Sequence, residues 1–185
     1  MSRYDTTWGE VKVPRQEWSV LARDLIGGVA TGEMAGLVML ATMMVSHAVL
    51  FGTSVWFPLQ VIGSFLFGDA ALDGARTEAA VTGLILHLLG PSLFWGFVFG
   101  ALVHVTGFRR GFGIFALGPL VGLAASVIDV KLILPAAMTE MYGQDIWARE
   151  ILGLRSWLYH IVFGLTLTRF AWVYRTLFAQ PPPSS

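Results

Sequence analysis

The side chains of this chain that could do chemistry are ionisable residues placed inside long apolar stretches. Counting about 1.5 Å of rise per residue from each helix end predicts that one group lies at a similar depth. Its members are His47, His87, Asp129, Lys131 and His160. Because a charge in hydrocarbon costs several kcal/mol, ionisable residues at such positions are the strongest indication of a functional site.

Three interpretations of this group remain open. In the first, Asp129 neutralises a neighbour and the histidines hydrogen-bond across helices as packing contacts. In the second, His87 and His160 ligate a b-type haem, because bis-histidine sites in helix bundles use ligands on facing helices at equal depth. Phe94 and Phe163 would then line the haem pocket. In the third, the group forms a site for protons, a metal ion or a small ligand, since histidine titrates near neutral pH.

A second group of ionisable residues lies nearer the other ends of the same helices. It contains Glu33, His104 and Arg169. Glu33 and Arg169 have opposite charges and a similar predicted depth, so we expect them to form an ion pair that fixes the register of two helices.

Catalytic and metal-binding motifs are missing from the sequence. There is no nucleotide-binding loop, nucleophile elbow or His-Glu-x-x-His pair. Ser46 and His47 are adjacent, so their side chains point in different directions on a helix and form no dyad. The chain has no cysteine, which excludes thiolate metal sites, iron–sulfur clusters and covalent haem. We therefore predict a protein that is not an enzyme and has no catalytic residue or protein-bound metal ion.

The elements that must position these residues are transmembrane helices. The chain is 55% hydrophobic and only 13% charged, about half the charge of an ordinary soluble domain. About 20 apolar residues are needed to cross the hydrocarbon core, and four stretches are long enough. They are residues 25–51, 79–105, 112–138 and 154–178. The predicted fold class is an all-α membrane protein with a four-transmembrane-helix bundle.

The segments outside these helices have distinct predicted places. Residues 1–24 form a polar N-terminal segment, residues 25–178 the transmembrane domain, and residues 179–185 a disordered tail. Residues 58–67 are apolar but too short to span, which predicts an interfacial or re-entrant helix after the first span. The amphipathic residues 139–153 are expected to lie on the membrane surface.

The basic residues predict the orientation of the helices in the membrane, and the glycines predict how the helices pack. Most arginines and lysines flank the helix ends nearest the two termini, which predicts that both termini are cytoplasmic in a bacterial inner membrane. Glycines recur at four-residue intervals in the first and second helices, as in Gly28-x-x-x-Gly32 and Gly96-x-x-x-Gly100. Such faces let two backbones approach closely, so we expect tight packing within the molecule.

Several short motifs together resemble a known group of proteins. They include Gly28-x-x-Thr31-Gly32, Gly83-x-x-x-His87, Arg110-Gly111-x-Gly113, Pro135 and His160-x-x-x-Gly164. The pattern is similar to uncharacterised bacterial four-helix inner-membrane proteins, of which the YagU-like proteins are one branch. The resemblance covers about residues 28–175 and implies that His87, Pro135 and His160 are shared positions. It implies no catalytic activity, and Asp129 and Lys131 are not part of it.

The preferred functional hypothesis is a small membrane subunit or accessory protein within a larger membrane complex, such as a respiratory or other energy-transducing one. Its partners would be the lipid bilayer and other membrane subunits, and the net charge of zero gives no indication of nucleic-acid binding. The first alternative is a redox subunit that holds haem b between His87 and His160. The second alternative is a small transporter or channel that uses the His/Asp/Lys cluster.

Overall fold

The chain folds into a set of packed helices, and the computed structural model describes residues 15–74, 76–151 and 153–178. Within these residues every regular element is a helix and no strand forms, which confirms the all-helical fold class. Most of the predicted N-terminal segment, residues 1–14, and the predicted tail, residues 179–185, lie outside the described residues.

Three helices of the described chain are long and apolar enough to cross a membrane: Ser19–Leu50, Thr77–Thr106 and Phe112–Tyr142. The first belongs to α1 (Arg15–Leu50); the second joins α3 (Thr77–His87), η2 (Leu88–Ser92) and α4 (Leu93–Thr106); the third joins α5 (Phe112–Val127), η3 (Ile128–Ile133) and α6 (Leu134–Tyr142). They match the first three predicted spans. The first helix begins at Arg15, so residues 15–24 of the predicted N-terminal segment are helical.

The fourth predicted span, residues 154–178, is two helices rather than one. They are α8 (Gly153–Leu167) and α9 (Phe170–Phe178). At the break the backbone tightens, because the N–H of Thr168 bonds to the carbonyl of Leu165 at 3.2 Å and that of Arg169 to Thr166 at 3.0 Å. The Thr168 hydroxyl donates to the same Leu165 carbonyl at 2.7 Å, which competes with continued helix. Neither piece alone has the length of a membrane span.

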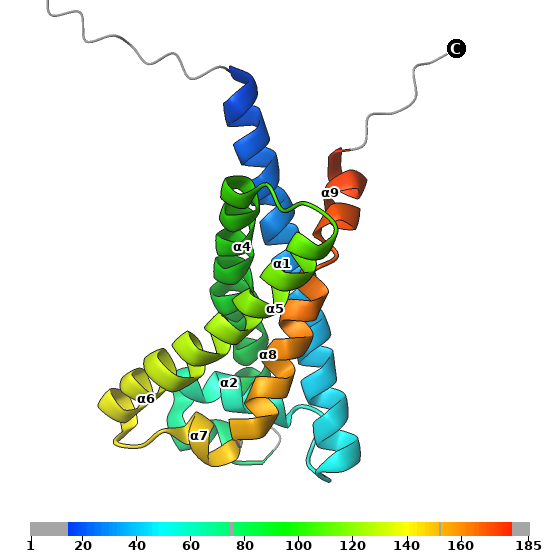
Figure 1. Ribbon diagram of the computed structural model, residues 1–185. Coiled ribbons are helices and arrows are strands. Elements are labelled where there is room, and N and C mark those ends of the chain that lie inside the picture. The colour runs from blue at the N-terminus through cyan, green and yellow to red at the C-terminus, as the bar shows by residue number, and fades with distance from the viewer. Residues whose placement is uncertain (1–14, 75, 152, 179–185) are drawn as a thin grey trace, which may run out of the picture.

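A layer of short helices covers the end of the molecule away from the termini (Figure 1). It consists of α2 (Phe57–Phe67), η1 (Gly68–Leu72) and α7 (Ile146–Glu150). The predicted short helix at residues 58–67 is therefore present as α2, and it packs on α3. On the outside of this layer Arg149 binds the Asp69 carboxylate, which holds the pKa of Asp69 below its ordinary value.

Glycines set how closely the long helices approach. A Cβ on Gly28 would lie 2.4 Å from the Cα of Gly100, and one on Gly32 would lie 2.4 Å from the Cα of Gly96. Thus α1 and α4 touch backbone to backbone. In the same way α5 packs on α8, where a Cβ on Gly122 would lie 2.3 Å from the carbonyl oxygen of His160. The prediction that the glycine faces pack within the molecule is confirmed.

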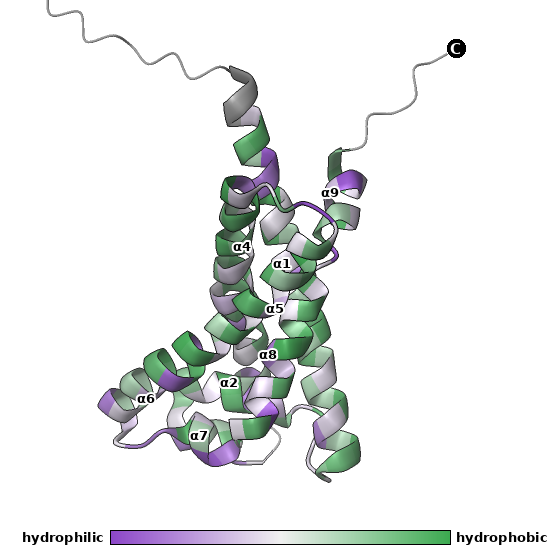
Figure 2. Cartoon of the chain, in the orientation of Figure 1, coloured by the Kyte–Doolittle hydropathy of each residue, from purple (hydrophilic) through white to green (hydrophobic). Residues whose placement is uncertain are grey.

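The outer surface of the molecule is largely apolar. Figure 2 shows hydrophobic residues along the outward faces of the long helices, with hydrophilic residues mainly toward the two ends. Large apolar side chains point away from the protein, such as Phe112 at 88% exposure and Val105 at 82%. The buried core runs the length of the bundle, from Phe99 and Phe170 at one end to Ile146 near the other. An exterior of this kind suits hydrocarbon rather than water.

The close glycine contacts generate a test of the fold. Replacing Gly32→Ala places a methyl group against the backbone of α4, so we expect the free energy of unfolding to fall by ~1–3 kcal/mol. Gly90→Ala is the matched control, because a Cβ at Gly90 meets nothing within 4 Å. The measurement is equilibrium unfolding in mixed detergent micelles. Equal stability of the two variants would contradict backbone contact between α1 and α4.

Candidate functional site

Two wide helical turns face one another in the second and third long helices. Both η2 and η3 have π-helical geometry, a form that often marks functional sites. Each involves a proline, Pro91 inside η2 and Pro135 just after η3. Because proline has no backbone N–H, it removes one helical hydrogen bond and pushes the preceding turn out of regular geometry. His87 lies directly before η2 and Asp129 lies within η3, so the irregular turns place both side chains.

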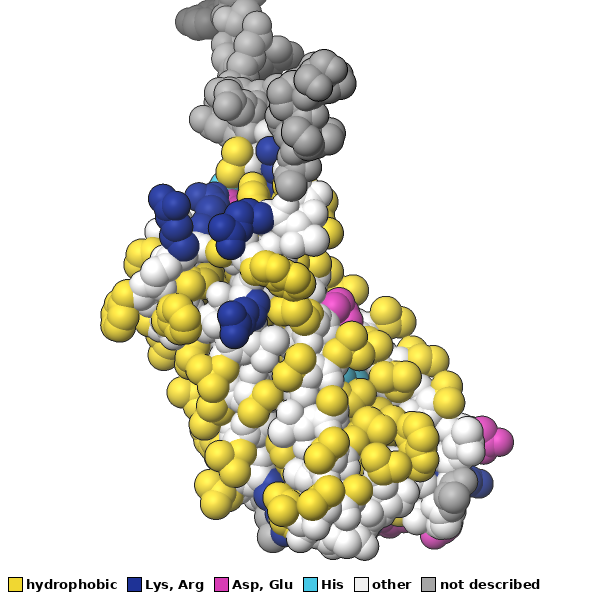
Figure 3. Space-filling view, turned by 90° about the vertical axis from the view of Figure 1, so that its right-hand side faces the viewer, with side chains coloured by type: hydrophobic (Ala, Val, Ile, Leu, Met, Phe, Trp, Pro, Cys, Tyr) yellow, Lys and Arg dark blue, Asp and Glu magenta, His cyan; other side chains and the backbone are white. Residues whose placement is uncertain are grey.

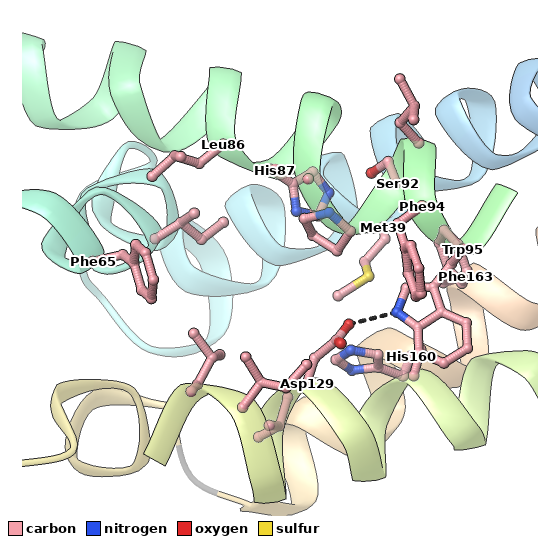
Figure 4. Close-up of a pocket in the computed structure, with 18 of the residues that line it drawn as sticks. Met39, Phe65, Leu86, His87, Ser92, Phe94, Trp95, Asp129, His160 and Phe163 are labelled. Carbon is pink, nitrogen blue, oxygen red and sulfur yellow. Dashed lines mark hydrogen bonds between the residues drawn. The ribbon is translucent and has the colours of Figure 1, made fainter. Parts of the chain in front are cut away.

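Between these turns lies a cavity of about 690 Å³ with mostly apolar walls. This volume lies in the range of small-molecule sites. Residues from α1, α2, the second and third long helices, α7 and α8 contribute to the lining. Its polar or aromatic lining residues are Phe65, His87, Ser92, Phe94, Trp95, Phe97, Asp129, Trp147, His160 and Phe163. Figure 4 shows His87, Asp129 and His160 reaching the cavity from three different helices.

The His87 ring is fixed in one tautomer by the backbone of α1. Its Nε2 lies 3.0 Å from the carbonyl oxygen of Gly36, and the ring is only 5% exposed. A carbonyl oxygen can only accept, so Nε2 carries the proton and donates it. In the neutral ring, Nδ1 therefore keeps its lone pair. No hydrogen-bond partner of Nδ1 exists in the described chain, and His87 lines the cavity.

His160 is arranged in the same manner with the two nitrogens exchanged. Its Nδ1 donates to the carbonyl oxygen of Ser156 at 2.8 Å, one turn earlier on α8. Nε2 is then the acceptor of the neutral ring, and among the described residues it has no partner. The ring is 6% exposed and lines the same cavity as His87. Each of the two buried imidazoles thus has an acceptor nitrogen without a partner, and both rings line the same cavity.

Asp129 adds a third acceptor at the cavity. Its Oδ2 accepts a hydrogen bond from the indole Nε1 of Trp95 at 2.7 Å, drawn as the dashed line in Figure 4. Across the described residues, no lysine, arginine or histidine lies within ion-pair distance of the carboxylate. Nearby, the hydroxyl oxygen of Ser92 is buried without a partner. Several polar atoms that line this cavity could therefore form further hydrogen bonds.

The predicted group of five ionisable residues is divided by the structure. His87, Asp129 and His160 meet at the cavity, whereas His47 and Lys131 do not line it. The His47 ring bonds Thr53 Oγ1 at 3.1 Å and packs on two phenylalanines at the end of α1. Lys131 is exposed and lines a separate hollow of about 130 Å³.

The second predicted group is rearranged. In the described chain Glu33 and Arg169 do not form the expected ion pair, since Arg169 is exposed at the α8–α9 break and Glu33 Oε1 is buried without a partner. Asp24, fully buried on α1, is the ionic centre instead. It accepts hydrogen bonds from Arg109 and, at 2.9 Å, from Nδ1 of His104. The carboxylate raises the pKa of Arg109 in the α4–α5 loop.

Sequence reasoning missed Trp95, Trp147 and Asp24. A signal for Trp95 was present, because tryptophan in membrane proteins is concentrated at the interfaces and Trp95 lies in the middle of a span. Its position four residues after Pro91 also places it on the side of the irregular turn. Trp147 was assigned to the interface alone, and Asp24 to a polar segment outside the membrane.

No protein-family model, no curated protein and no solved structure matches this chain. The resemblance to YagU-like proteins therefore stays a prediction, as do the absence of catalytic activity and the role as a subunit of a larger complex. One reason for the subunit hypothesis was the glycine-lined faces, and the main ones are occupied by contacts inside the molecule.

The Asp24 centre can be tested by removing its cation. Arg109→Gln leaves a fully buried carboxylate without its arginine, so we expect the free energy of unfolding to fall by about 2–4 kcal/mol. Arg110→Gln, at the exposed neighbouring position, should change it by less than about 0.5 kcal/mol. Equilibrium unfolding of both variants in the same micelles is the measurement. A loss of equal size in both would refute a specific role for Arg109.

Proposed function

We propose that this protein binds a lipophilic small molecule inside the membrane, in the cavity between η2 and η3. The observation that carries the proposal is the pairing of apolar walls with two histidine lone pairs and a carboxylate that have no further protein partner. Buried polar groups in proteins are normally satisfied, and unsatisfied ones call for a function. A ligand with a polar group and an apolar body would satisfy them.

The entrance to the cavity supports a ligand that arrives from the bilayer. Several lining residues belong also to the outer surface, among them Leu89 at 67% exposure, Phe94 at 54% and Ile133 at 53%. Because these side chains lie midway along helices long enough to span, the opening would face hydrocarbon. A lipophilic compound already concentrates in that medium, so it needs no aqueous path.

The membrane arrangement that we propose has a fourth crossing made of α8 followed by α9. The two helices run one after the other along α1, and both pack on it (Figure 1). Figure 3 shows Lys and Arg side chains gathered at the end from which both termini leave. Arg109, Arg110 and Arg175 belong to this end. Under the positive-inside rule it would face the cytoplasm of a bacterial inner membrane.

Cross-linking tests the proposed site. We expect a neutral alkyl diazirine, photolysed with the protein in nanodiscs, to label cavity residues in a saturable way. Leu134→Trp narrows the half-buried wall of the cavity and should reduce this labelling roughly tenfold, about 1.4 kcal/mol of binding. Leu120→Trp, at an exposed site outside the cavity, should leave it unchanged. Labelling that is confined to lipid-facing residues, or never saturates, would exclude a binding cavity.

Haem b is the second candidate occupant, because both histidines present a ring nitrogen to one cavity. The remaining lining fits haem poorly. Haem carries two propionates, and no lysine or arginine is among the residues that line the cavity. A buried carboxylate without a cation or hydrogen bonds is strongly unfavourable. Asp129 would add a further negative charge.

An absorption spectrum separates the two occupants. We expect the purified protein to show no Soret band, with or without added haem, because its cavity offers the propionates no cationic partner. A Soret band that is lost in both His87→Phe and His160→Phe, and kept in His47→Phe, would replace the lipophilic ligand by haem. His47 is a matched control because it is equally buried but lies outside the cavity.

A further inference from the structure

Three unsatisfied polar groups that line the cavity are acceptors, while two others, the Ser92 hydroxyl and the Trp147 indole N–H, can donate. His87 Nδ1 and His160 Nε2 are lone-pair nitrogens, since the other nitrogen of each ring donates to a backbone carbonyl. The Asp129 carboxylate is acceptor-only when ionised and already receives one bond from Trp95. A ketone, ester or quinone carbonyl also only accepts, so it would leave all three atoms unsatisfied. A ligand that satisfies these three acceptors must donate.

The charge of the site narrows the class of donor. An ionised carboxylate in an apolar medium is costly unless a cation neutralises it. In the part of the chain that the structure describes, no basic side chain is within ion-pair distance of Asp129. Nor does Lys131 line the cavity, although it is only two residues away. A cationic ligand would supply the missing counter-charge.

The walls of the cavity also suit a cation with an apolar body. Phe65, Phe94, Trp95 and Phe163 are among the lining residues, and Phe94 and Trp95 meet edge to face at 5.3 Å between centroids. The faces of aromatic rings attract ammonium groups by about 0.5–2 kcal/mol, more when water is absent. Met39, whose thioether is labelled in Figure 4, adds a soft apolar wall beside them.

We propose that the cavity binds a primary ammonium group carried on an apolar body. A primary ammonium has three N–H donors, and the cavity offers three acceptors on three helices: His87 Nδ1, His160 Nε2 and the Asp129 carboxylate. This inference rests on the proposed function and specifies its ligand. The ammonium belongs either to a free lipophilic amine or to an aminolipid headgroup. The headgroup would bring a phosphate to a cavity lined by no lysine or arginine, which favours the free amine.

Competition against the diazirine label tests the ligand class in nanodiscs of phosphatidylcholine at neutral pH. Three probes share one chain: dodecylamine, dodecyltrimethylammonium and dodecanol. Dodecylamine should displace the label at roughly tenfold lower concentration than either of the others. The trimethyl compound keeps the charge but has no N–H donor, and the alcohol keeps a donor but has no charge. Equal potency of dodecylamine with either one would overturn the inference.

A pair of carboxylate variants then locates the effect. Asp129→Asn should remove the preference for dodecylamine, whereas Glu33→Gln should preserve it, because Glu33 does not line the cavity. A preference that survives Asp129→Asn would overturn the inference. The three-probe comparison on the unaltered protein requires no substitution, so it decides the matter even if Asp129→Asn fails to fold.

Two further outcomes keep the proposals separate. If the diazirine never labels the cavity, the proposed function itself fails. If it labels the cavity and dodecanol competes as well as dodecylamine, the binding function stands and the ammonium inference fails. Nanodiscs that contain phosphatidylethanolamine identify the source of the ammonium. Loss of labelling there supports an aminolipid headgroup, and unchanged labelling supports a free lipophilic amine.

Discussion

The glycine contacts between helices are the constraint on which the remaining architecture depends. Gly28 and Gly32 bring α1 against α4, while Gly118 and Gly122 bring α5 against α8. Apolar side chains gain nothing from leaving lipid for a helix interface, so close backbone contact has to hold such pairs together. The two pairs are tight along much of their length. Further from the termini, α6 diverges from the rest of the bundle (Figure 1), and the cavity lies on that side.

The prolines act on this framework at the point where the pairs separate. Each interrupts the regular hydrogen bonding of a long helix, and a π-helical turn results in η2 and in η3. An irregular turn at membrane depth is tolerated where it is buried in protein or lines a cavity. Here both turns line the cavity. The same feature that disturbs the helices therefore directs His87 and Asp129 toward one another.

Sequence reasoning recovered the long helices because their signal is local and strong. Apolar length predicted four spans, three of which are single long helices, and an apolar run too short to span predicted α2. The break before Phe170 was missed. It involves a hydrogen bond from the Thr168 hydroxyl to the backbone, and a single threonine in an apolar stretch is only a weak signal of a helix end. Depth counting grouped His87, Asp129 and His160, and all three line the cavity. His47 is buried as well but lies in the last turn of α1, outside the cavity, and Lys131 is exposed, because depth along a helix does not say which face a residue occupies.

The ion pair predicted between Glu33 and Arg169 also rested on depth along the helices. Opposite charge and equal depth suggested Glu33 with Arg169, but the helix break exposes Arg169. Asp24 instead accepts a hydrogen bond from Arg109 in the short α4–α5 loop, a contact between residues far apart in the sequence. Trp95 and Asp129 form another such contact, which connects α4 with η3. Contacts of this kind follow from the crossing of helices, which the pattern of a single helix does not encode.

The position of Lys131 explains why the charge of Asp129 is left for something else to neutralise. Two residues apart on a helix, side chains point in roughly opposite directions, since each residue turns by about 100°. Lys131 is therefore directed away from the cavity, toward the hollow beside Trp147 and the exposed surface. If the role of Asp129 were only to pair with a lysine, a spacing of three or four residues would have served better. The observed spacing keeps a carboxylate beside two lone-pair nitrogens without a protein cation, the arrangement that an external donor can complete.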